Sequence, residues 1–107
     1  MDLTIESISK DGYHLLSLSG DVDTKTAPSL LDALTALELA ALAELRIEMD
    51  QVGFLSSAGL RALVFAKQKM PHTARLVLVG TSADIADVIT KTGLTQAVTL
   101  VATHDDL

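Results

Sequence analysis

Apolar and polar residues alternate along several short segments of this chain, and this pattern predicts strands. Between residues 45 and 50 every second residue is apolar and the others are charged, as in a strand with one buried face. Extended patterns also cover residues 3–8 and 13–18, which the turn at 10–12 joins into an antiparallel hairpin. Short apolar runs at 75–79 and 98–101 predict two further strands.

Helical spacing of apolar residues marks the segments between these strands. The first helix is predicted to open at Ala27, with Pro28 in its first turn and Thr24 or Thr26 as its cap. Its apolar stripe continues through the leucines that follow, but no glycine or proline marks its end. The second helix is predicted over residues 58–70, after which a proline stops it.

A third helix is predicted between a cap at Thr81 or Ser82 and Gly93, which has the position of a glycine just past a last turn. The predicted order is therefore β-β-α-β-α-β-α-β. Strands that alternate with helices need crossover connections, so we expect an α/β fold with a mixed, mainly parallel sheet and helices mainly on one face. Residues 1–107 form one predicted domain, and the polar residues 103–107 are expected to fray.

The stretch from Met49 to Arg61 reads as the end of a strand, a tight loop and the start of a helix. Ser56 or Ser57 occupies the position where the helix needs an N-cap. A phosphate on either hydroxyl would be held by free backbone N–H groups and by the helix dipole. The alternative is that Ser57 is only a cap.

Residues 54–61 read Phe-Leu-Ser-Ser-Ala-Gly-Leu-Arg, which resembles the signature loop of the STAS domain of bacterial anti-sigma factor antagonists. The likeness extends over nearly the whole chain, although the family usually has a further C-terminal helix. The resemblance implies that Ser57, two places before the glycine, is phosphorylated by a partner kinase. Ser56 stands where many relatives have aspartate.

A second segment, residues 20–27, matches the Gly-acid-x-Asp-x-x-Thr-Ala pattern of these antagonists. The resemblance implies that Asp21, Asp23 and Thr26 lie beside the phosphorylated serine and contact the kinase. The alternative from local sequence alone is a turn followed by a helix cap.

Arg61 and Phe65 lie four residues apart and therefore share one face of the second helix with Ala58. An exposed Phe65 beside an arginine would be typical of a binding hot spot, whereas a buried Phe65 would belong to the core. The predicted partner-binding set, in which Ser57 is the phosphorylation site, comprises Asp21, Asp23, Thr26, Ser56, Ala58, Gly59, Arg61 and Phe65.

Composition narrows the classes of function. The chain has no cysteine, which excludes disulfides, a thiol nucleophile and a thiolate metal site. Its formal net charge is -6 and no basic cluster is present, which argues against nucleic acid and anionic membranes and is compatible with a basic partner. No basic leader or long apolar run is visible, so we expect a cytoplasmic protein.

Other chemistries fit the sequence poorly. Ser57-Ala58-Gly59 matches half of the G-x-S-x-G motif, but residue 55 is leucine, and nothing places His14, His72 or His104 beside the serine. The acid pairs 21/23 and 105/106 supply too few ligands for a metal, and no P-loop is present. We therefore expect no enzyme activity, no metal and no cofactor.

The leading hypothesis from the resemblance is a phosphorylation-controlled partner switch. The unphosphorylated protein would bind an anti-sigma factor serine kinase, phosphorylation of Ser57 would release it, and a metal-dependent serine phosphatase would restore the hydroxyl. The alternative is a STAS subunit of a transporter or larger signalling complex that docks through the same loop without phosphorylation.

Overall fold

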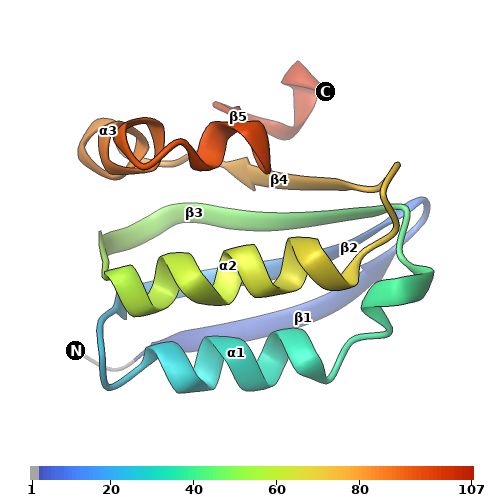
Figure 1. Ribbon diagram of the computed structural model, residues 1–107, viewed down its shortest axis with the longest axis horizontal. Coiled ribbons are helices and arrows are strands. Elements are labelled where there is room, and N and C mark those ends of the chain that lie inside the picture. The colour runs from blue at the N-terminus through green and yellow to red at the C-terminus, as the bar shows by residue number, and fades with distance from the viewer. Residues whose placement is uncertain (1–2) are drawn as a thin grey trace.

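The computed structural model describes residues 3–107, which contain a five-stranded sheet in the order β1-β2-β3-β4-β5 (Figure 1). β1 and β2 pair antiparallel, whereas each later strand runs parallel to its neighbour. The mixed sheet predicted from the sequence is therefore confirmed. The strands are β1 (Thr4–Lys10), β2 (Tyr13–Val22), β3 (Glu44–Leu55), β4 (Arg75–Val79) and β5 (Thr99–Val101).

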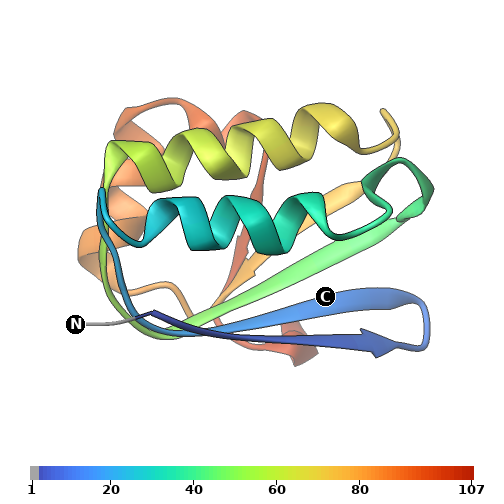
Figure 2. The same cartoon turned by 90° about the horizontal axis from the view of Figure 1, so that it is seen from below.

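Two helices, α1 (Ala27–Thr35) and α2 (Ser57–Lys69), lie side by side on one face of the sheet (Figure 2). Helix α3 (Ala83–Lys91) adds Ile85 and Ile89 to the same buried core. Aliphatic side chains dominate this core, as the composition requires. Within residues 3–107, no helix has the length and apolar character needed to cross a bilayer.

β3 continues to Leu55, five residues beyond its predicted end, because it stays paired with β2 up to Val22. The register shifts twice, and each shift leaves an extra residue on β3. The buried side chains Met49, Val52 and Leu55 therefore recur every third residue instead of every second. β2 also runs on to Val22, past its predicted end at Leu18, so Asp21 is a strand residue.

Local helix signals are confirmed at α3. The Ser82 hydroxyl accepts a hydrogen bond from the Ile85 N–H at 3.3 Å, and Gly93 beyond the last turn has a φ of 79°. The expected fraying of residues 103–107 is wrong. These residues form the 3-10 turn η3 (His104–Asp106), in which the Asp106 carboxylate accepts the Thr103 N–H at 3.0 Å.

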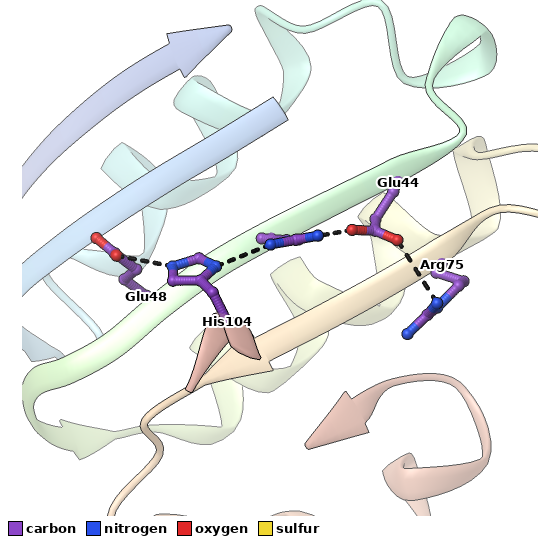
Figure 3. Close-up of polar contacts among 5 residues, drawn as sticks. Glu44, Glu48, Arg75 and His104 are labelled. Carbon is purple, nitrogen blue, oxygen red and sulfur yellow. Dashed lines mark hydrogen bonds and ion pairs between the residues drawn. The ribbon is translucent and has the colours of Figure 1, made fainter. Parts of the chain in front are cut away.

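The sheet face opposite α1 and α2 carries a chain of polar contacts (Figure 3). Arg46 Nε donates to Glu44 at 2.6 Å, and Arg46 Nη1 lies 3.0 Å from His104 Nδ1. Because arginine only donates, Nδ1 must accept, and Nε2–H then donates to Glu48 at 2.9 Å. Arg75 extends the chain by its 3.7 Å contact with Glu44. His104 thus ties η3 to β3.

Candidate functional site

The loops that follow β2 and β3 lie next to each other, at the left of Figure 1, because these strands are parallel and end at the same edge. Asp21 pairs with Phe54 and Val22 pairs with Leu55 in the strand register. The Ser56 N–H then donates to the Val22 carbonyl at 2.7 Å. The acidic loop and the serine loop are therefore brought together, as the sequence analysis expected.

Ser56, and not Ser57, is the N-cap of α2. Its backbone is extended, at φ -78° and ψ 168°, and its hydroxyl accepts the Gly59 N–H at 3.2 Å. Ser57 is the first residue of the helix and is exposed. Its hydroxyl takes no part in the cap.

The loop before α1 is held by Asp23 rather than by a threonine cap. Thr26 occupies the N-cap position, but its backbone is already helical and its side chain makes no cap bond. Instead, the Asp23 carboxylate accepts the N–H groups of Lys25 and Thr26, each at 2.9 Å. The Thr26 hydroxyl accepts the Asp23 N–H at 2.9 Å and donates to the Asp21 carbonyl at 2.7 Å.

These hydrogen bonds also set the ionisation of Asp23. The Thr26 N–H is the main cause that holds the pKa of the Asp23 carboxyl below its ordinary value of 3.8, and partial desolvation opposes it. The Thr26 hydroxyl and the Lys25 N–H add to the lowering. Asp23 is thus a fixed negative charge beside the serine loop at neutral pH.

Gly59 lets the start of α2 pack closely against the strand ends. A Cβ at this position would lie 2.6 Å from Leu55 Cδ1 and 2.7 Å from Val22 Cγ1, closer than side-chain carbons approach. Gly59 is buried, so any effect of this residue on a partner is transmitted through packing. The buried face of α2 also contains Ala62, Leu63 and Ala66, and Leu60 and Val64 pack against the core while staying partly exposed.

A shallow apolar groove runs between α1 and α2 next to Ser57. Its volume is about 280 Å³, which suits one or two side chains better than a drug-sized ligand. Phe65 is half-buried in its wall, so neither of the two placements foreseen for this ring applies fully. We call this feature the α1–α2 groove; it is lined by Thr24, Ala27, Pro28, Leu31, Ala58, Arg61, Ala62 and Phe65.

Phe54 is a surface residue that the sequence analysis did not single out. Its side chain is 52% exposed at the end of β3, paired with Asp21 on the sheet face opposite the helices. The two register shifts of β3 cancel, so Phe54 faces outward as strict alternation from Leu45 would place it. It was missed because the strand was predicted to end at Asp50. Exposed aromatics of this kind are enriched in protein-binding surfaces.

Two histidines that could have served Ser57 have other partners. His14 Nε2 lies 2.7 Å from the Ser7 hydroxyl, and His104 belongs to the polar chain on the opposite sheet face. In the described part of the chain, no three His, Cys, Asp or Glu side chains are grouped as metal ligands. The site is therefore a set of surface groups around one free hydroxyl.

Comparison with known proteins places these features in a family context. The STAS domain model matches residues 4–107. The anti-sigma-B factor antagonist of Listeria monocytogenes is 30% identical over 100 residues, which cover 92% of this chain and 88% of the relative. The structure of an anti-sigma factor antagonist from Mycobacterium paratuberculosis superposes with a TM-score of 0.87 at 31% identity, covering 97% of this chain and 89% of the other. The phosphorylated form of SpoIIAA from Bacillus shares the fold, with a TM-score of 0.70 at 15% identity, covering 97% and 94% of the two chains.

Proposed function

The chain belongs to the STAS domain family, and we propose that it is an anti-sigma factor antagonist controlled by phosphorylation of Ser57. Unphosphorylated, it binds an anti-sigma factor serine kinase and frees the sigma factor or comparable client that the kinase holds. The kinase then transfers the γ-phosphoryl group of ATP to the Ser57 hydroxyl, whose proton is lost, and ADP is the other product. A metal-dependent phosphatase hydrolyses the ester to serine and inorganic phosphate.

The observation that carries this proposal is the separate placement of the two serines. Ser56 occupies the capping role that either residue could have filled, so the exposed Ser57 hydroxyl has no structural duty. It directly precedes Ala58, which lines the α1–α2 groove, and follows the strand end that pairs with Asp21 and Val22, so a partner bound at either feature would cover it. This protein supplies no catalytic group to the transfer; it presents a substrate hydroxyl.

The charge of a single phosphate group explains how phosphorylation would dissociate the complex with the kinase. A phosphoserine carries nearly two negative charges at neutral pH. Within the free protein the helix end offsets this charge by about 0.3–1 kcal/mol, and the phosphorylated SpoIIAA structure has the same fold. In an interface built around a hydroxyl, a buried charge without a partner costs about 3–5 kcal/mol, or two to three and a half decades of affinity. Asp21 and Asp23 add like-charge repulsion.

The test uses each anti-sigma serine kinase of the source organism, purified and titrated with this protein. We expect one kinase to bind the parent protein and Ser57→Ala equally, and to bind Ser57→Asp about a hundredfold or more weakly. With ATP, intact mass should rise by one phosphate in the parent and stay constant in Ser57→Ala. Thr73→Asp, which adds a negative charge at an exposed site beyond the other end of α2, is the matched control and should bind like the parent.

The decisive contrary result is a kinase that binds the parent and Ser57→Asp equally and adds no phosphate. Phosphorylation control would then be wrong. A protein that docks in this way without modification would fit the alternative of a regulatory STAS subunit in a transporter or larger signalling complex.

A further inference from the structure

We propose that Arg61 is a counter-ion used by both states of the switch. In the unphosphorylated protein it binds a carboxylate of the partner at the rim of the α1–α2 groove, and after phosphorylation it pairs with the phosphate on Ser57 of its own helix. This proposal rests on the proposed function and names the chemistry of the contact that phosphorylation would break.

The residues that line the α1–α2 groove indicate what kind of partner segment would bind there. Its walls are formed by alanine, proline, leucine and phenylalanine side chains with one threonine, and Arg61 is the single charged residue among those that line it. None of the ion pairs within residues 3–107 involves Arg61, which is exposed. The complementary ligand is therefore a protein segment with one bulky apolar side chain and a nearby aspartate or glutamate.

Helix geometry brings Ser57 and Arg61 together. They are exposed residues at positions i and i+4 of α2, which lie one above the other on a helix surface. The acidic group would be on the N-terminal side of the basic one, which is the favoured order for such pairs. A guanidinium matches phosphate oxygens with two parallel N–H donors and makes stronger bonds to them than to neutral groups.

The consequence is a competition for one cation. The phosphoryl group that the kinase transfers from ATP to Ser57 draws Arg61 along its own helix and away from the groove rim. The partner's carboxylate is then left without its counter-ion at the same time as the phosphate brings repulsion to the interface. Release thus combines repulsion with the loss of a specific attraction.

The first measurement needs no partner. The protein is produced with phosphoserine incorporated at position 57, and the second ionisation of the phosphate is followed by ³¹P NMR. Arg61 should favour the dianion, so Arg61→Gln should raise the titration midpoint by about 0.2–0.4 pH unit. Lys67→Gln removes the same charge from α2 more than two turns away from Ser57 and should leave the midpoint unchanged.

The second measurement uses the kinase identified by the Ser57 variants, without ATP. Arg61→Gln should weaken its binding about tenfold or more, Arg61→Lys should recover part of the loss, and Lys67→Gln should bind like the parent. Equal ³¹P midpoints for the parent and Arg61→Gln would overturn the phosphate pairing. Equal kinase affinities would overturn the carboxylate contact. Either result leaves phosphorylation control standing, because the Ser57 variants test that separately.

Discussion

Asp23 fixes the conformation of the acidic loop between β2 and α1. Its carboxylate accepts two backbone N–H groups, while the Thr26 hydroxyl joins Asp23 to the Asp21 carbonyl. The loop therefore reaches α1 through side-chain bonds that an aspartate or asparagine and a hydroxyl residue provide together. Asp23 fixes the shape of the loop beside Ser57, and its negative charge would also contribute to the proposed phosphorylation switch.

The ionisation of Asp23 gives a direct test. Its folded pKa lies below the ordinary 3.8, so the carboxylate stabilises the fold at pH values above 3.8, and this contribution disappears as the pH falls through the folded pKa. NMR titration of the carboxyl carbon should give a midpoint below 3.8. Thr26→Ala, which removes the hydroxyl but keeps the main N–H donor, should raise the midpoint only part of the way. A parent midpoint at or above 3.8 would contradict the hydrogen bonding described here.

Two neighbouring serines at the start of α2 have different structural roles, and stability measurements can distinguish them. Ser56→Ala removes the acceptor of the Gly59 N–H and should lower the free energy of unfolding by about 0.5–2 kcal/mol. Ser57→Ala removes an exposed hydroxyl that is outside the cap and should change it by less than about 0.5 kcal/mol. Urea unfolding followed by circular dichroism measures both. A larger loss for Ser57→Ala would show that the capping roles are reversed.

The helices could be predicted largely from sequence because their end signals are local. Ser82, Gly93 and the proline in the first turn of α1 act on neighbouring backbone groups, so their positions are informative without knowledge of the fold. The choice between Ser56 and Ser57 could not be made in this way, because both are good caps. It is decided by the bond from the Ser56 N–H to Val22, a residue of another strand.

The ends of the strands, and the face of the sheet on which each side chain lies, could not be predicted from the sequence because they depend on contacts between distant segments. The two register shifts of β3 arise from its pairing with β2, and they decide that Val52 is buried while Gln51 and Gly53 are exposed. The α1–α2 groove likewise depends on how two helices pack, so helical spacing could place Arg61 and Phe65 on one face without showing what that face meets.

At the scale of the whole molecule, the candidate partner-binding residues lie around one edge of the sheet. Ser57 lies where β3 passes into α2, with the α1–α2 groove on the helix side and Phe54 on the opposite side. Ligand sites of parallel α/β sheets are found at this carboxyl edge because the loops there converge. A partner that covers Ser57 can therefore touch an apolar groove, an exposed aromatic ring and an acidic loop without any change in the fold.

The polar chain on the opposite sheet face is expected to hold the C-terminal turn in place without affecting the proposed phosphorylation of Ser57. His104 bonds Arg46 and Glu48 and stacks on Tyr13 at 6.2 Å between ring centroids. His104→Ala should lower the free energy of unfolding by about 0.5–1.5 kcal/mol and speed hydrogen exchange at the Thr103 amide. The matched control is His72→Ala, at an exposed position after α2, which should change neither.

His104→Ala also tests whether loss of stability affects phosphorylation of Ser57. His104 contacts the first half of β3 and Tyr13 at the start of β2, whereas Ser57 follows the last residues of β3 at the other end of the sheet. Phosphorylation of His104→Ala at Ser57 should therefore proceed at the parent rate under conditions where both proteins are folded. A slower rate at full folding would mean that the two faces of the sheet are coupled, and that the partner's footprint extends beyond the edge at which Ser57 lies.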